Sequence, residues 1–326
     1  MSQFAQLDIR QVKTYSARTR NSKVQSEAEA KPLQAGMNVS QFLESLPRLL
    51  KVQELFEIAT AVVQARENGK PVLAMLGGHV IKTGCTPVLA DLMEHGFITH
   101  VAGNGSMAIH DTELEILGQT SEDVAAQLQD GSFGMAHEVA EVLNSSAKSA
   151  QLEELGFGEA LGRSLCTEQN HHVARSLVAK AFDHKVPCTI HVALGTDIVH
   201  QHPSADGAAI GDASLRDFRI LANTVSQLGG GGVVLNFGSA VIMPEVFLKT
   251  LAVARNLGYP VQGFTTANLD MIQHYRPTVN VVQRPVLGSG KGYALTGHHE
   301  IMIPLLAVAI YEQAEDVRYI EKEISS

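Results

Sequence analysis

The sequence of 326 residues contains no tryptophan, only three cysteines and only 18% charged residues. The cysteines, Cys85, Cys166 and Cys188, lack CxxC spacing, and their odd number argues against a disulfide framework or a thiolate zinc site. The longest nearly unbroken apolar stretch runs only over 301–311, far short of the roughly 20 residues that a membrane-spanning helix needs. The first residues also lack the apolar core of a signal peptide. We therefore expect a cytoplasmic protein without disulfides or membrane contact.

The chain also lacks an excess of positive charge. Its 25 basic and 34 acidic residues give a net charge of −9, which disfavours binding to the phosphates of nucleic acids and to anionic lipids. Hydrophobic residues make up 45% of the sequence, enough for one large core or two modest ones. The sequence is rich in glycine and histidine, with 28 and 14 residues, and such residues often carry ligand chemistry in loops.

Residues 1–39 are polar and carry five basic residues between Arg10 and Lys23. This composition predicts either an extended arm that wraps a neighbouring subunit or a solvated tail. From Ser40 onward, apolar residues recur at helical spacing, and no linker rich in proline, glycine or serine follows. We predict a single domain over 40–326, with a helical insertion around 111–162.

Beyond Gly69, short apolar runs alternate with longer amphipathic ones. The pattern predicts strands at 71–76, 97–102, 186–193, 232–237, 259–264 and 278–283. It predicts helices at 86–95, 173–184, 214–227 and 244–256. This alternation is typical of an α/β fold with a doubly wound, mostly parallel sheet and helices on both faces.

Ligands of such sheets bind where the strands end and the chain enters a helix. The segments predicted there are rich in glycine and in side chains that form hydrogen bonds: Lys82, Thr83, Gly84, Asn104, Gly105, His110, Asp111, Asp197, Asn236, Gly238, Thr265 and Thr266. Each has an ordinary explanation as a turn or a helix cap, but five such segments on one rim predict a polar cleft for a phosphate-bearing cofactor. Neither GxGxxG nor GxxxxGK[ST] is present.

Three of these residues have more specific alternatives. Asp197 follows an apolar strand and is either a ligand of a ribose or an N-cap. His110 and Asp111 are either an acid–base pair or, for Asp111, a helix cap. The histidine pairs 171–172 and 298–299 lack the H-x-x-x-H spacing of a zinc helix, so we expect no metal.

Several of these segments resemble two related families. The second half, from PCTIHVALGTDIV through GGGGVVLNF and YPVQGFTTANLD to GYALTGHHEIMIPLL, resembles deoxyhypusine synthase in the order and spacing of its motifs. The first half, LGGHVIKTGCTPVLADLMEHGFITHVAGNGSMAIHDTELEILG, is similar to that family and still more similar to the NAD-dependent ornithine cyclodeaminase domain of arginine-degrading proteins. The resemblance covers about 70–310.

The resemblance implies a doubly wound NAD-binding fold and oxidation of a carbon that bears an amine. It places NAD near Thr83, Gly84, Asn104, Gly105, Asp197, Thr265, Thr266 and Ala267. It also implies a homo-oligomer, because deoxyhypusine synthase is a homotetramer with active sites between subunits.

The sequence departs from deoxyhypusine synthase at the residues that carry its chemistry. Leu235 and Asn236 stand where that family has lysine and histidine, and the tryptophan and covalent lysine of its butylamine transfer are replaced around Arg284. A guanidinium stays protonated and cannot form an imine. We therefore expect an NAD-dependent oxidation or deamination of a small amine or amino acid, with His110, Asp111, Lys82 and Asn236 at the reactive end. Two alternatives remain open: a non-catalytic NAD-binding or assembly protein, and an aminobutyl transferase.

Overall fold

The computed structural model describes residues 3–167 and 175–324, with side chains as far as residue 315. The chain divides into two units, Met1–Val52 and Gln53–Ser326. The first unit has little regular structure: η1 (Ala17–Thr19), η2 (Ser26–Ala28) and α1 (Val39–Ser45). Asn38 begins α1 with a capping box, in which its side chain accepts from the Gln41 backbone at 2.8 Å and the Gln41 side chain accepts from the Asn38 N–H at 3.0 Å.

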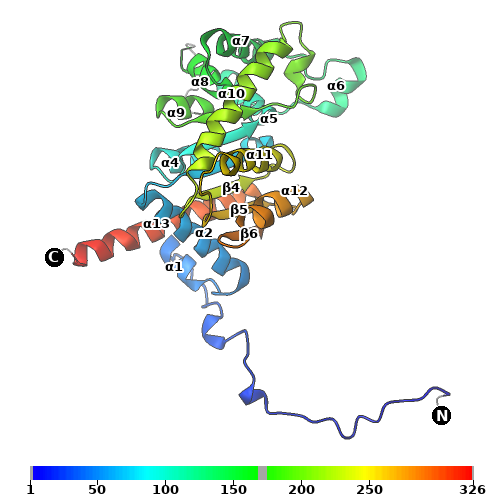
Figure 1. The fold of residues 1–326 in the computed structure, drawn as a ribbon, viewed down its shortest axis with the longest axis vertical. Coiled ribbons are helices and arrows are strands. Elements are labelled where there is room, and N and C mark those ends of the chain that lie inside the picture. Colours follow the sequence, from blue (N-terminus) through cyan, green and yellow to red (C-terminus); the bar gives the residue numbers. More distant parts are fainter. Residues whose placement is uncertain (1–2, 168–174, 325–326) are drawn as a thin grey trace. The chain divides into compact units, whose positions relative to one another are not determined.

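The second unit is built on six parallel strands in the order β3-β2-β1-β4-β5-β6 (Figure 1). The strands are β1 (Val72–Leu76), β2 (His100–Asn104), β3 (Cys188–His191), β4 (Val233–Phe237), β5 (Thr265–Asp270) and β6 (Lys291–Thr296). The central strands β1 and β4 are buried at every residue, as expected where helices cover both faces. The predicted α/β fold with a doubly wound parallel sheet is confirmed.

Helices fill the connections between the strands. They are α2 (Leu50–Glu67), α3 (Gly78–Lys82), α4 (Thr86–Glu94), α5 (Gly105–Leu117), α6 (Val124–Asp130), α7 (His137–Glu153), α8 (Phe157–Thr167), α9 (Leu177–Asp183), η3 (Ile198–Gln201), α10 (Gly207–Ser226), α11 (Ile242–Asn256), α12 (Tyr275–Pro277), η4 (Thr278–Gln283), η5 (Arg284–Val286) and α13 (His299–Ile324). Because strand order reverses between β1 and β4, right-handed crossovers place the helices before and after that point on opposite faces. One buried core joins Leu73 and Met75 of β1 to Phe247 of α11 and to Phe264.

The described residues between β2 and β3 form the helices α5 to α9 and the segments that connect them. The helix predicted at 173–184 is observed as α9, which begins at Leu177. Its predicted first two residues lie outside the described residues, as do His171 and His172.

Two of the six predicted strands are wrong. Residues 259–264 precede the fifth strand, and TTANLD, interpreted as the loop after it, is β5 itself. The other, 278–283, is the π-helix η4. Its β-branched residues are typical of a strand, which explains the wrong prediction. The true last strand, β6, packs so closely on η4 that a Cβ at Gly292 would lie 1.8 Å from the Val282 carbonyl oxygen.

Strand β3 has a free edge, and two side chains of α10 satisfy its backbone there. The Ser214 hydroxyl accepts from the Val192 N–H and donates to the Ile190 carbonyl, both at 3.0 Å. Asp217 Oδ2 accepts from the N–H groups of Ile190 at 2.7 Å and Gly158, at the start of α8, at 3.0 Å. Helix α10 therefore protects an edge that would otherwise pair with another chain.

Asp217 gains this role at an electrostatic cost. Its side chain is fully buried, and burial raises its pKa to about 7, although the hydrogen bonds from Ile190 and Gly158 act in the opposite direction. Oδ1 has no hydrogen-bond partner among the described residues, so it is the oxygen that can carry the proton.

We expect this carboxyl group to make the folded state more stable in mild acid. The folded chain retains the Asp217 proton up to about pH 7, whereas the unfolded chain releases it near pH 4, so stability falls as pH rises between those values. Relative to Asp217→Asn, the wild-type free energy of unfolding should fall by about 2 kcal/mol between pH 5 and pH 8, measured by urea unfolding. Asp212→Asn, on the exposed side of α10, should keep the wild-type slope; equal slopes in all three proteins would contradict the assignment.

The three cysteines are free thiols, and burial raises the pKa of each. Within the described part of the chain, none of the helices has the length and apolar composition needed to cross a membrane. The same residues contain no group of three or more histidine, cysteine or acidic side chains placed to hold a metal ion.

Candidate functional site

Three predicted site residues line one cavity near the carboxyl ends of β2 and β3. The cavity has a volume of about 160 Å³, and its wall includes Lys82, His110 and Asp197. These side chains come from the last residue of α3, from the middle of α5 and from the segment that follows β3. The wall also includes Ser106, Glu113, Ser121, Glu122, Phe133 and Thr196. Residues distant in the sequence thus meet at the edge where parallel sheets bind their ligands.

His110 is held in place through one nitrogen of its ring. Nδ1 lies 3.0 Å from Glu113 Oε2 and 2.8 Å from Thr120 Oγ1. The Thr120 hydroxyl also donates to Glu113, so the three side chains form a closed cluster. Nε2 has no hydrogen-bond partner among the residues that the structure describes, which leaves this nitrogen able to exchange a proton with a ligand.

Glu113 is a site residue that our sequence reasoning missed. Burial raises the pKa of Glu113, but hydrogen bonds from His110 and Thr120 outweigh this effect and hold the pKa below its ordinary value. The resulting carboxylate orients the imidazole through its contact with Nδ1. The signal was available, because residues three apart on a helix lie on the same face.

Close backbone approaches shape the other wall of the cavity. A Cβ at Gly105 would lie 2.0 Å from Asp197 Oδ2, and one at Gly78 would lie 1.9 Å from Ser106 Oγ. The Asp197 carboxylate therefore rests against the first residue of α5, where the helix dipole favours negative charge. Its side chain is only 9% exposed, and burial raises the pKa of Asp197 against the opposing effect of His200.

The structure corrects the prediction that Asp111 belongs to the reactive end. The segment is helix α5 and not a loop, so adjacent residues point in different directions. Asp111 is fully buried and caps α9: it accepts from the Leu177 N–H at 2.8 Å, the Val178 N–H at 3.1 Å and the Ser176 hydroxyl at 2.5 Å. The alternative interpretation as a cap is therefore the correct one, but the capped helix lies 66 residues further along the chain.

Asn236 lies inside β4 and not in a loop that follows the strand. Its Nδ2 donates to Asn268 Oδ1 at 2.7 Å, and Asn268 donates to Gln273 Oε1 at 2.7 Å. Asn236 Oδ1 is buried and has no partner among the described residues, and the same holds for both ring nitrogens of His299 at the start of α13. Gly238 adjoins that imidazole, because a Cβ there would lie 2.4 Å from His299 Nε2. Unpartnered polar atoms thus occur beside the point where the strand order reverses.

Three of the predicted cofactor residues have local structural roles. Thr83 ends α3 and donates from its hydroxyl to the Val80 carbonyl at 3.0 Å. Gly84, at φ +75°, makes the turn toward α4. Asn104 caps α5 by accepting from the Met107 N–H at 3.0 Å. These roles fix the backbone at the ends of α3 and β2.

The last three predicted cofactor residues lie elsewhere. Thr265, Thr266 and Ala267 are the first residues of β5 and pair with the first half of β4, so they do not reach the carboxyl edge of the sheet. Thr266 is buried and donates to the Val281 carbonyl at 2.8 Å. The glycine run 229–232 likewise precedes β4, at the opposite edge from the cavity. The error follows from placing the fifth strand one segment too early.

Part of the chain matches a described family. Residues 56–151 match the Rossmann-fold part of the arginine dihydrolase ArgZ-like C-terminal region. This range includes β1, β2 and the segment whose resemblance to arginine-degrading proteins was given by sequence. The resemblance of the second half to deoxyhypusine synthase stays a prediction. No curated protein matches the chain.

Solved structures share the fold at low sequence identity. The arginine dihydrolase ArgZ of cyanobacteria is 14% identical with a TM-score of 0.51, over 80% of this chain and 31% of that one. A putative LOR/SDH protein of Methanococcus maripaludis S2 is 15% identical with a TM-score of 0.51, over 81% and 71%. AgrE, solved with ornithine and NAD+, is 12% identical with a TM-score of 0.53, over 81% and 33%. The chain thus spans about a third of the length of ArgZ and AgrE.

The structural role of Asp111 leads to a stability prediction. Asp111→Ala leaves the first N–H groups of α9 buried without an acceptor, so we expect it to lower the free energy of unfolding by about 3 kcal/mol. The matched control is Asp123→Ala, which removes the exposed cap of α6 and should cost about 1 kcal/mol. Urea unfolding measures both; similar losses would show that Asp111 does not stabilise α9 as described.

Proposed function

We propose that the protein is an NAD-dependent enzyme that oxidises or deaminates a small amine or amino acid, of the ornithine or polyamine type. The observation that carries this proposal is the His110–Glu113 pair, which presents an unpartnered imidazole nitrogen in a cavity at the carboxyl edge of a Rossmann-like sheet. Oxidising an amine requires a base for the nitrogen-bound proton and an acceptor for the hydride.

His110 would serve as that base. A substrate N–H proton moves to Nε2 while the hydride leaves the neighbouring carbon, and a C=N bond remains. NAD, when bound, accepts the hydride. Glu113 stabilises the imidazolium that results, because its carboxylate already contacts Nδ1. Hydrolysis of the imine would then release ammonia in a deamination.

The charges around the cavity suit a substrate with both an amine and a carboxylate. Lys82 supplies a cation at an exposed part of the wall, whereas Asp197 and Glu113 supply buried acidic groups. A carboxylate near Lys82 and an ammonium group near the acidic side chains would pair each substrate charge with an opposite one. An α-amino acid with an amine side chain meets this requirement.

The residues present fit NAD at the point where the strand order reverses. Gly77, Gly78 and Gly105 pack closely on Gly238, Ser106 and Asp197, which fixes the backbone after β1 and β2. A pyrophosphate would be held there by backbone N–H groups, as at the N-terminus of α5. The unpartnered atoms of Asn236 and His299 offer polar groups at the carboxyl end of β4 and the start of α13. We propose Gly77, Gly78, Gly105, Asn236 and His299 as the NAD contacts, with Asp197 as the candidate for a ribose. AgrE, a protein of similar fold, was solved with ornithine and NAD+, and this supports the proposal.

The proposal predicts turnover that depends on His110. With ornithine or a polyamine as substrate, we expect NADH formation by the wild type and a loss of about 100-fold or more in kcat for His110→Gln. Glu113→Gln should retain part of the activity, because the amide oxygen can still accept from Nδ1 of His110 but carries no charge to stabilise the imidazolium formed during the reaction. His95→Gln, an exposed histidine on another helix end, is the matched control and should keep full activity.

Cofactor binding is measured separately, by the rise in Tm with added NAD. His110→Gln should keep this rise, since the variant removes only the base. A wild type that is stabilised by NAD but oxidises no amine in a broad screen would favour the non-catalytic alternative. The absence of any NAD-dependent rise in Tm would overturn the proposal. We expect no butylamine transfer to a protein lysine, because Arg284 cannot form the imine.

We further propose that the protein is a homo-oligomer, a dimer or a tetramer. The first unit exposes Leu7 by 90%, Ile9 by 70% and Tyr15 by 75%, an arrangement that would cost free energy in a monomer. Light scattering of the full chain should give a mass that is a multiple of 35.0 kDa, and a mass of 35.0 kDa itself would contradict the proposal.

A further inference from the structure

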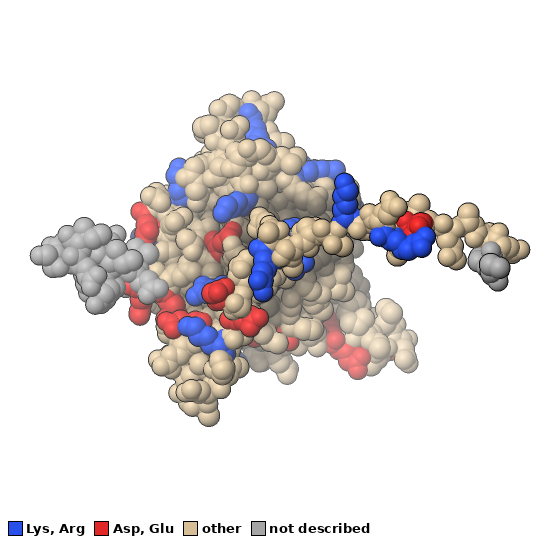
Figure 2. All heavy atoms as spheres, turned by 90° about the horizontal axis from the view of Figure 1, so that it is seen from below, with Lys and Arg blue, Asp and Glu red and all other residues tan. Residues whose placement is uncertain are grey.

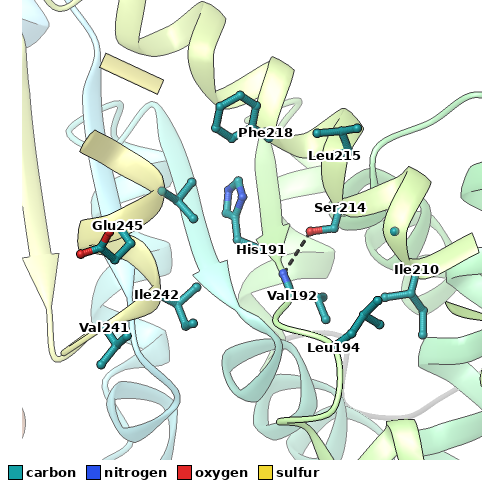
Figure 3. Close-up of a pocket in the computed structure, with 12 residues that line it drawn as sticks. His191, Val192, Leu194, Ile210, Ser214, Leu215, Phe218, Val241, Ile242 and Glu245 are labelled. Carbon is teal, nitrogen blue, oxygen red and sulfur yellow. Dashed lines mark hydrogen bonds between the residues drawn. The ribbon is translucent and has the colours of Figure 1, made fainter. Parts of the chain in front are cut away.

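A second cavity lies at the end of β3 and is chemically unlike the first. Its volume is about 370 Å³, within the range of small-molecule sites. Figure 3 shows His191 between the side chains of α10, among them Leu215 and Phe218, and those at the start of α11, Val241 and Ile242. Nearly all of this wall is apolar. Leu215 is 56% and Val241 is 44% exposed, so the cavity opens to solvent.

The polar floor of this cavity is one end of a buried chain of hydrogen bonds. His191 Nε2 lies 3.0 Å from Thr189 Oγ1, and the same hydroxyl lies 3.1 Å from His100 Nε2. His100 Nδ1 lies 2.8 Å from Thr224 Oγ1. Burial lowers the pKa of both histidines to about 3, so both rings are neutral at ordinary pH. His191 Nδ1 has no hydrogen-bond partner among the described residues.

This series of hydrogen bonds allows Nδ1 of His191 to pair with either a donor or an acceptor of a ligand. The Thr189 hydroxyl has one proton, so it donates to one histidine and accepts from the other. When Thr189 donates to His191, Nδ1 carries the proton of that ring and acts as a donor. When Thr189 donates to His100, the proton of His191 is on Nε2 and Nδ1 acts as an acceptor. Rotation of the Thr189 hydroxyl, together with the matching change of tautomer in both histidines, therefore converts Nδ1 of His191 between a donor and an acceptor.

The charges around the cavity restrict its ligand further. The residues that line it include no lysine or arginine, so an anion would find no partner there. Its one carboxylate, Glu245, already contacts Lys249, Arg276 at 3.3 Å and Asn280 at 2.9 Å. An organic cation would thus compete with existing partners.

We propose that this second cavity binds a small neutral molecule with an apolar body and one hydrogen-bonding group, such as an amide or an alcohol, which pairs with His191 Nδ1. The site is separate from the His110 cavity, and no lining residue is shared. Its occupation does not depend on the oxidation proposed above.

The absence of tryptophan permits a direct test. Phe218→Trp places a single fluorophore in the wall of the cavity, and Phe182→Trp places the control fluorophore in another cavity, of about 320 Å³. We expect hexanamide to change the emission of Phe218→Trp saturably, with a Kd on the order of millimolar, as befits so small a ligand. Hexanoate and hexylamine should bind about tenfold more weakly, because desolvating their charge is costly. Phe182→Trp should not respond.

A second variant isolates the role of His191. In Phe218→Trp with His191→Phe, hexanamide affinity should fall about tenfold while benzene, which needs no hydrogen bond, binds as before. A parallel loss of both ligands would assign His191 only a structural role and overturn the proposal. Equal binding of hexanamide and hexanoate to Phe218→Trp, or no response to any ligand, would overturn it as well.

Discussion

The architecture depends on one constraint: parallel strands end at the same edge of their sheet. Six strands bring the segments that follow β1, β2, β3 and β4 to one rim, although more than 150 residues separate the first from the last. Figure 2 shows one face of the molecule, on which basic and acidic side chains are interspersed rather than gathered into one large basic patch. Chemistry in this fold is thus set by individual side chains at the rim and not by a general electrostatic field.

Two buried carboxylates make this packing specific. Asp111 and Asp217 each accept from backbone N–H groups of a separate element, and both lie on helices that flank the sheet. From the sequence alone, an acidic side chain in a helix is expected to be solvated, because the groups that donate to it lie tens of residues away. Burying these side chains costs free energy, which the hydrogen bonds from backbone N–H groups offset. Asp111 thus fixes the start of α9, and Asp217 joins β3 at Ile190 to the start of α8.

The sequence predicted most of the fold because four of the six strands are apolar runs with clear ends. It failed at β5, whose polar side chains form hydrogen bonds with neighbours such as Val281 and Asn236, and at η4, whose valines favour a strand.

The candidate site was predictable in part. Lys82, His110 and Asp197 follow apolar strands and meet in one cavity. Thr266 was predicted in the loop after the fifth strand, but it lies within that strand. Glu113 lies in the predicted helical insertion, but the sequence pattern did not show that the same helix begins at Gly105 and therefore includes His110.

The histidines of the two cavities, His110 and His191, have different surroundings. His110 Nδ1 contacts the carboxylate of Glu113, and Nε2 has no hydrogen-bond partner among the described residues. Among the described residues, the ring of His191 has one hydrogen-bond partner, the Thr189 hydroxyl; it lies within a largely apolar wall, and burial keeps it neutral. The first environment suits proton transfer, and the second suits recognition without charge. Both rings lie near the carboxyl end of the sheet, and their different partners are the reason why the proposed proton transfer is assigned to the first and the proposed recognition of a neutral molecule to the second.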